Sequence, residues 1–145
     1  ELISPVIGKT KRHIKNSKQF SDVIRTCTVD EGEELRSYDV TALFTSVLVD
    51  KAVAFIKRRL EQDENLHKRT KMSPEDIAKL LKFCLSCTYF VFDGQFYIQI
   101  HGAAMGSPIS MLVCHGYMEQ TITTAPHSPA WWYRYVDDTH TKQYG

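Results

Sequence analysis

The sequence lacks the features that mark membrane, secreted and repeat proteins. No run approaches the ~20 apolar residues that a membrane span needs, and no charged-then-apolar signal segment opens the chain. It has no Asn-x-Ser/Thr sequon, no internal repeat and no low-complexity segment. Four cysteines in 145 residues are too few for a disulfide framework in a chain of this size. We therefore expect one globular, intracellular domain that has no membrane partner.

A metal-binding cysteine pair and a strongly charged surface are also missing. Cys84 and Cys87 have zinc-like spacing, but no second Cys or His pair follows them, so we interpret both as small apolar residues of a helix. The net charge of +1 favours no partner by itself. Cations are nevertheless clustered, and such clusters hold phosphate backbones or form solvated surfaces. The first cluster is Lys9, Lys11, Arg12, Lys15 and Lys18, and the second is Lys57, Arg58, Arg59, Lys68, Arg69 and Lys71.

The periodicity of apolar residues predicts helices alternating with strands. After an irregular segment 1–16, Asn16-Ser17 is typical of a helix start, and 35–40 reads as a strand. We expect Asp50 to cap a helix that buries Val53, Ile56 and Leu60, and 62–71 to be a polar connection. Ser73-Pro74 indicates the start of another helix. Its expected buried stripe is Ile77, Leu80, Leu81 and Cys84.

The second half of the chain predicts a hairpin, a helix and a strand. Residues 89–92 and 95–98 flank Asp93-Gly94, the preferred dipeptide of a tight hairpin turn. Pro108 opens a helix that we expect to end near Thr121, and a strand begins at Trp131. The pattern as a whole predicts an α+β fold with an antiparallel sheet backed by helices.

Three acidic residues stand at strand ends. Asp137 and Asp138 follow the strand-forming run 131–136, and Asp39 lies near the end of the strand predicted at 35–40. An Asp-Asp pair alone is most often a solvated hairpin tip. Two or three carboxylates from different strands are, however, enough to hold Mg²⁺, and two such ions about 3.5–4 Å apart can clamp a nucleotidyl transfer. Adjacent strand residues point to opposite faces, so Asp137 and Asp138 can share a site only if the chain turns there.

A glycine-rich loop and an aromatic residue lie between these acids in the sequence. Gly102 and Gly106 permit close approach of a nucleotide to the backbone, although a hairpin-to-helix turn also uses glycines. Phe44 would crowd a 2′-hydroxyl if it lay under the incoming sugar, and simple core packing is its alternative role. The order of strand-borne Asp, glycine-rich loop entering a helix, and aromatic-Val-Asp-Asp turn is typical of a template-directed polymerase palm.

Three segments carry a resemblance to a known family. Ser-Tyr-Asp-Val-Thr-Ala-Leu-Phe-Thr-Ser (37–46), Gly-Ala-Ala-Met-Gly-Ser-Pro-Ile-Ser (102–110) and Trp-Tyr-Arg-Tyr-Val-Asp-Asp-Thr (132–139) resemble motifs A, B and C of reverse transcriptases. The resemblance is to the Penelope-like retroelements, relatives of telomerase, and it runs from about Lys9 to Thr139. His13-Ile14-Lys15-Asn16-Ser17 and Tyr117-Met118-Glu119 are also similar to that group.

This resemblance implies an RNA-directed DNA polymerase that uses two Mg²⁺ ions, with Mn²⁺ as an alternative, and takes an RNA template, a DNA primer and dNTPs in the nucleus. It implies catalysis by Asp39, Asp137 and Asp138, metal ligation by these residues and the Val40 carbonyl, and a sugar gate at Phe44. Template or nucleotide contacts are implied for Gly102, Met105, Gly106, Ser107 and Pro108, and nucleic-acid contacts for the first cationic cluster.

The chain departs from the family pattern in several places. Met111 and His115 replace an expected Pro and Asn, and Gly116 inside a helix should cost about 1 kcal/mol relative to Ala. We expect residues 1–145 to be a fragment of the fingers and palm, with the thumb and C-terminal domains absent and little activity by itself. A viral RNA-dependent RNA polymerase is disfavoured by Phe44 and Val136, where that class has Asp and Gly. A catalytically inactive, nucleic-acid-binding remnant of a decayed element is the alternative from another functional class.

Overall fold

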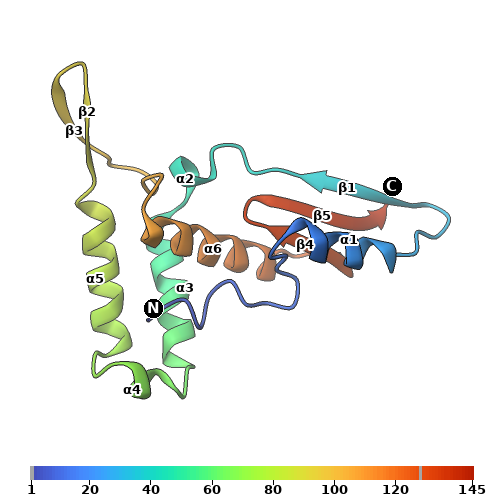
Figure 1. Cartoon of the computed structure of the whole chain (residues 1–145), viewed down its shortest axis with the longest axis horizontal. Helices are drawn as coiled ribbons and strands as arrows, with labels where there is room; N and C mark the ends of the chain where they lie inside the picture. The colour runs from blue at the N-terminus through green and yellow to red at the C-terminus, as the bar shows by residue number, and fades with distance from the viewer. Residues whose placement is uncertain (1, 128) are drawn as a thin grey trace.

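The structure is a computed structural model that describes residues 2–127 and 129–145. Helices and antiparallel strands are mixed along the chain, as expected for an α+β fold (Figure 1). The helices are α1 (Ser17–Arg25), α2 (Leu43–Ser46), α3 (Val49–Glu61), α4 (Leu66–Arg69), α5 (Pro74–Ser86) and α6 (Pro108–Thr123). The strands are β1 (Glu33–Tyr38), β2 (Tyr89–Phe92), β3 (Gln95–Ile98), β4 (Trp131–Tyr135) and β5 (Asp138–Tyr144).

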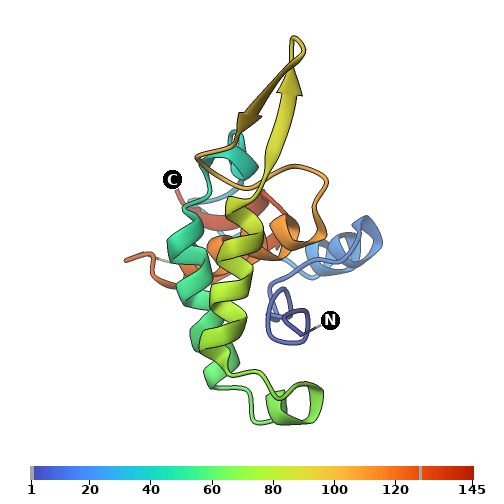
Figure 2. The same ribbon diagram turned by 90° about the vertical axis from the view of Figure 1, so that its left-hand side faces the viewer.

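Two separate antiparallel sheets are present in the described part of the chain. The larger has the order β1-β5-β4, so the last strand of the chain lies between its partners. The smaller is the predicted hairpin β2–β3, which is confirmed with Asp93-Gly94 as its turn. Figures 1 and 2 show this hairpin projecting beyond the end of α5. Its side chains are exposed throughout, which leaves aromatic surface in water.

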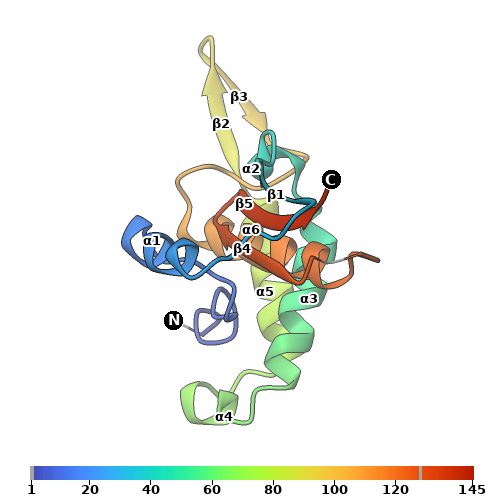
Figure 3. The same ribbon diagram turned by 90° about the vertical axis from the view of Figure 1, so that its right-hand side faces the viewer.

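Helix α6 lies between the other long helices and the larger sheet. α3 and α5 run side by side, and α6 packs against α3 (Figure 2). The view in Figure 3 places α6 behind the sheet. A Cβ added at Gly116 would lie 3.1 Å from Ile56 Cγ1, so the glycine that weakens this helix allows its close approach to α3. His115, which precedes Gly116 in α6, contacts Arg134 of β4.

The core is built mainly from these three helices and from α2. Apolar side chains need a shared, water-free volume, and the stripes of α3 and α5 supply most of it. Residues Val53, Ile56 and Leu60 of α3 are buried as predicted. The buried cluster is Ile7, Leu43, Val47, Ala52, Val53, Ile56, Leu60, Leu66, Ile77, Ala78, Leu81, Leu85, Ala103, Val113, Cys114 and Met118.

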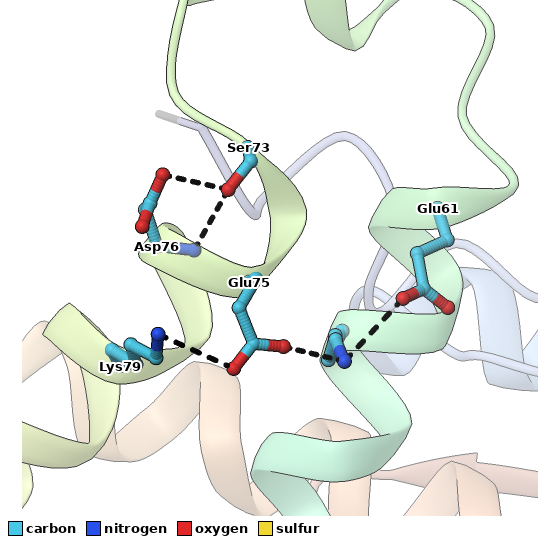
Figure 4. Close-up of polar contacts among 6 residues, drawn as sticks. Glu61, Ser73, Glu75, Asp76 and Lys79 are labelled. Carbon is cyan, nitrogen blue, oxygen red and sulfur yellow. Dashed lines mark hydrogen bonds and ion pairs between the residues drawn. The ribbon is translucent and has the colours of Figure 1, made fainter.

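Two predicted helix starts are confirmed by their caps. The Asn16 side chain accepts a hydrogen bond from Gln19 N at 2.9 Å, which begins α1. At α5, Ser73 Oγ accepts from Asp76 N at 3.1 Å and donates to Asp76 Oδ2 at 2.6 Å (Figure 4). Pro108 is likewise the first residue of α6, which ends at Thr123, two residues beyond the predicted end.

Other expectations were wrong in detail. The strand predicted at 35–40 lies at Glu33–Tyr38, because β5 fixes its length by pairing Tyr144 with Glu33 and Thr139 with Tyr38. Asp50 is not a cap: α3 starts one residue earlier, and Asp50 forms an ion pair with Lys82 at 2.7 Å. The predicted connection 62–71 contains the short helix α4.

The buried stripe of α5 also differs from the prediction. Leu80 is half exposed and Cys84 is exposed. Cys87 is exposed as well, and it follows α5 as its C-cap residue and does not lie inside the helix. Ile77, Leu81 and Leu85, at spacings of four, are buried together with Ala78.

Part of the second cationic cluster is paired within the protein. Lys57 of α3 contacts Glu75 at 2.6 Å and Glu61 at 3.6 Å, and Glu75 also contacts Lys79 (Figure 4). Arg69 pairs with Asp63. The ion pairs of Lys57 and Lys79 are open to solvent and contribute little stability, whereas Arg69 and Asp63 are partly buried. All of them engage charges that could otherwise bind phosphates. No helix in the described ranges is long and apolar enough to cross a membrane.

Candidate functional site

The candidate site begins at the turn between β4 and β5. Tyr135 pairs with Asp138, so Val136 and Asp137 alone form the turn, and Asp138 is the first residue of β5. Val136 has φ 53°, in the left-handed region that two-residue hairpin turns require and that Asn or Gly usually fills. A β-branched residue there costs about 1–2 kcal/mol. The predicted turn is confirmed, and it is strained at the residue before the first aspartate.

The sheet order brings the third aspartate to the same end. Tyr38, the last residue of β1, pairs with Thr139 of β5, so Asp39 leaves the sheet where Asp138 begins its strand. Asp39 and Asp138 are exposed and Asp137 is half-buried. Val40 follows with its side chain packed against the core.

The three carboxylates share a sheet end without converging on one point. Within residues 2–127 and 129–145, no three side chains of His, Cys, Asp or Glu are grouped so that they could hold a metal ion. Their chemistry nevertheless suits Mg²⁺, which takes hard carboxylate and carbonyl oxygens and keeps several waters. The residues therefore fit the ion by donor type and backbone placement, and binding would require their side chains to rotate inward.

The glycine-rich loop touches the segment that follows Asp39. Ala103 N donates a hydrogen bond of 2.6 Å to the Phe44 carbonyl. Gly102 has φ 71°, and a Cβ there would overlap the Phe44 carbonyl and lie 2.6 Å from Thr45 Cα. The structure thus brings two of the sequence-predicted site segments into contact. The close approach of Phe44 and Thr45 also explains why residue 102 is a glycine, without any contact to a nucleotide.

Met105, Gly106 and Pro108 of the loop are exposed to solvent, and Ser107 is half-buried. Gly106 has φ 88° and no described atom within 4 Å of an added Cβ, and Met105 is 77% exposed. Ser107 precedes α6 as its N-cap residue, and Pro108 is the first helical residue. The Phe44 side chain is half-buried against the core, which agrees with packing and leaves part of its ring accessible.

A buried polar cluster lies behind the turn and was not expected from the sequence. Arg134 is only 2% exposed, and its Nη1 donates to the Val136 carbonyl at 2.5 Å and lies 3.2 Å from His115 Nδ1. His115 packs edge-on against His13, with ring centroids 5.3 Å apart. The alternation along β4 carried a signal, because Arg134 shares a strand face with the buried Trp132.

Burial sets the protonation of this cluster. It lowers the pKa of His115 to about 4, with smaller effects from the charges of Arg134 and His13. It also lowers the pKa of Arg134, against the attraction of Glu119 and Asp137. Burial raises the pKa of Glu119, although a hydrogen bond of 2.7 Å from Gly8 N opposes this.

These shifts have opposite consequences for stability. The pKa of His115 is below its unfolded value of 6.5, so between about pH 4 and 6.5 the unfolded chain binds the proton and the folded chain does not. The stabilisation of the folded state linked to the neutral His115 ring is therefore complete above pH 6.5, and it is lost as the pH falls toward 4. The raised pKa of Glu119 acts in the other direction, because the folded state keeps that proton longer as the pH rises.

The first cationic cluster divides into one structural and four exposed members. Arg12 Nη1 donates to the Ala130 carbonyl at 3.0 Å, and its guanidinium lies 5.1 Å from the centre of the Trp132 ring. It therefore fastens the N-terminal segment to β4. The members exposed to solvent are Lys9, Lys11, Lys15 and Lys18.

A groove beside the turn was also not expected from the sequence. It has a volume of about 390 Å³ and lies between α1 and the strands that flank the turn. Phe20 of α1 packs against His140 of β5, with ring centroids 4.5 Å apart and the rings tilted by 34°. The groove is lined by Ile14, Asn16, Ser17, Phe20, Tyr135, Asp138 and His140.

Comparison with known proteins adds no family assignment. No protein-family model matches the chain, and no curated protein is significantly similar to it. The class that the structure defines is an α+β domain with acidic residues gathered at one end of an antiparallel sheet.

Proposed function

We propose that the chain is the fingers-palm portion of an RNA-directed DNA polymerase of a retroelement, acting in the nucleus on an RNA template, a DNA primer and dNTPs. The observation that carries this proposal is the strand order β1-β5-β4. It places Asp39 at the end of the sheet where the Val136-Asp137 turn and Asp138 lie. The contact of the glycine-rich loop with Phe44 supports the proposal, because it joins the second motif to the first.

In this proposal Asp39, Asp137 and Asp138 hold Mg²⁺, with the Val40 carbonyl assisting. The bound ions supply charge neutralisation for attack by the primer 3′-oxygen and departure of pyrophosphate. The residues of the chain itself provide position. The strained turn sets the place of Asp137, and the loop 102–108 could offer its exposed part at Met105 and Gly106 to a nucleotide.

Primer extension tests the proposal. The protein assayed is the longest open reading frame that contains this chain, with an RNA template, a DNA primer, dNTPs and Mg²⁺. Asp39→Asn and Asp137→Asn should each remove essentially all extension, and Asp138→Asn should have a milder effect. Asp93→Asn is the matched control, because Asp93 is an exposed carboxylate in the other hairpin turn, where Asn also tolerates the positive φ. Full extension by Asp39→Asn would refute the proposal.

A nucleic-acid-binding protein without turnover is the second candidate. It is favoured by the four exposed lysines of the first cationic cluster and by carboxylates that do not converge. In that case the reading frame should bind single-stranded RNA without extending a primer. Replacing the four lysines by alanine should flatten the salt dependence of binding, by roughly 0.7 in log–log slope for each phosphate that a lysine no longer neutralises.

A further inference from the structure

The buried guanidinium of Arg134 contacts a backbone carbonyl and a histidine, and no carboxylate pairs with it in the described part of the chain. A buried cation is costly unless it is well paired, and Arg134 forms no direct ion pair among the described residues. Its Nη1 instead meets the Val136 carbonyl and His115 Nδ1, while its Nη2 has no partner in the described part of the chain. Two of its closest contacts therefore belong to the strained turn and to helix α6.

The backbone of Arg134 is fixed independently of the turn. Its N–H donates to the Arg12 carbonyl at 2.9 Å, and its own carbonyl accepts from Ile14 N at 2.8 Å. These bonds add the N-terminal segment to the edge of β4 as a parallel bridge. The side chain of Arg134 thus extends from a residue whose backbone is hydrogen-bonded on both sides to the carbonyl of Val136, two positions later.

We propose that Arg134 is a positioning residue that holds Val136 in its left-handed conformation and thereby sets the place of the Asp137 carboxylate. Nothing in a valine side chain favours positive φ, so an external contact has to stabilise it. The 2.5 Å bond from a charged donor to the Val136 carbonyl is such a contact.

His115 completes the arrangement as an acceptor. Its depressed pKa keeps the ring neutral near pH 7, so Nδ1 can accept from Arg134 when Nε2 carries the proton. A lysine, with one compact ammonium, does not reproduce the rigid fork of guanidinium donors. The part of this inference that concerns metal binding rests on the proposed function, whereas the part that concerns the turn does not.

The backbone conformation of Val136 tests the inference in the 145-residue chain. Valine is labelled with ¹³C and ¹⁵N, and the Cα and Cβ shifts and the HN–Hα coupling of Val136 report its φ. In Arg134→Met these signals should move to values of negative φ or broaden, while those of the core residues Val53 and Val113 stay in place. Arg36→Met, which changes an exposed arginine of the same sheet, is the control and should leave Val136 unchanged.

Each result of this experiment either supports or overturns the positioning role of Arg134. Unchanged Val136 signals in a folded Arg134→Met chain would overturn the positioning role. If that variant loses the signals of Val53 and Val113 as well, Arg134→Lys replaces it, since it keeps the charge but not the fork of guanidinium donors that reaches the Val136 carbonyl. Movement of Val136 then supports the inference, and no movement overturns it.

Binding of Mn²⁺, followed by electron paramagnetic resonance, separates this inference from the proposed function. We expect Arg134→Met to weaken binding about tenfold or more relative to the native chain and to Arg36→Met. Absence of binding by the native chain would count against the metal site of the proposed function, while the Val136 signals would still decide the role of Arg134. Equal binding by the native and Arg134→Met chains would overturn the link between the turn and the metal.

Discussion

Replacing Gly102 with alanine should separate the glycine-rich loop from the segment that follows Asp39. At φ 71° an alanine costs about 1–2 kcal/mol by itself. Its Cβ would also overlap the Phe44 carbonyl and lie 2.6 Å from Thr45 Cα. These neighbours are backbone atoms, so no rotation of a side chain can relieve the overlap.

The cost of that overlap follows from the hydrogen bond that it breaks. When the two backbones move apart, Ala103 N is left without the Phe44 carbonyl as its acceptor. Ala103 is buried, and an unsatisfied buried N–H costs about 1–3 kcal/mol. Together with the conformational cost, Gly102→Ala should lower the free energy of unfolding by about 2–5 kcal/mol.

Gly106→Ala is the matched control for this substitution. Gly106 also has a positive φ, of 88°, but no described atom lies within 4 Å of the added Cβ. Both substitutions restrict the unfolded chain equally, so the difference between their costs isolates the contact with Phe44 and Thr45. We expect Gly106→Ala to cost only about 1–2 kcal/mol. Urea denaturation measures both, and equal costs within about 0.5 kcal/mol would refute the reasoning.

Three further predictions concern other parts of the chain. Phe44→Val should raise incorporation of ribonucleotides relative to deoxyribonucleotides by the reading frame if the ring gates the sugar; loss of both activities together, with a lower melting temperature, would mean that Phe44 only packs. His115→Asn should flatten the pH dependence of unfolding between pH 6.5 and 4. Between pH 6.5 and 4 the native chain should lose up to about 2 kcal/mol of its free energy of unfolding through His115, after discounting for the solvent-accessible part of the ring. Parallel pH curves of the native and variant chains would contradict the depressed pKa of His115. Phe92→Glu with Phe96→Lys should reduce aggregation in light scattering and leave the free energy of unfolding within about 0.5 kcal/mol, because both rings are exposed; a larger loss of stability would show that the hairpin packs.

Local chemistry made several elements predictable. The cap of α1 by Asn16, the Ser73-Pro74 start of α5 and the Asp93-Gly94 hairpin follow from residues within a few positions of one another. Helical spacing likewise predicted the buried face of α3, where Ile56 is fully buried. Such features depend on backbone preferences that neighbours in the chain already satisfy.

Errors occurred where a distant partner decides the outcome. Leu80 has the apolar character of a core residue, but no neighbouring element of the described chain covers it fully and it stays half exposed. Arg134 has the character of a surface residue, but the packing of α6 against the sheet buries it. Periodicity assigns residues to faces of an element, and only the neighbouring element decides which face is covered.

The sequence by itself determined the long helices, the β2–β3 hairpin and the turn beside the Asp-Asp pair, and it predicted which acidic residues could hold a metal. Tertiary structure alone decided that β5 lies between β1 and β4, which brings Asp39 to the end of the sheet where Asp137 and Asp138 lie. It also decided that Gly102 touches Phe44 and that a buried arginine supports the turn. The physical reason is range: turns and caps are local hydrogen bonds, whereas strand order and burial arise from contacts between segments that are far apart in the chain.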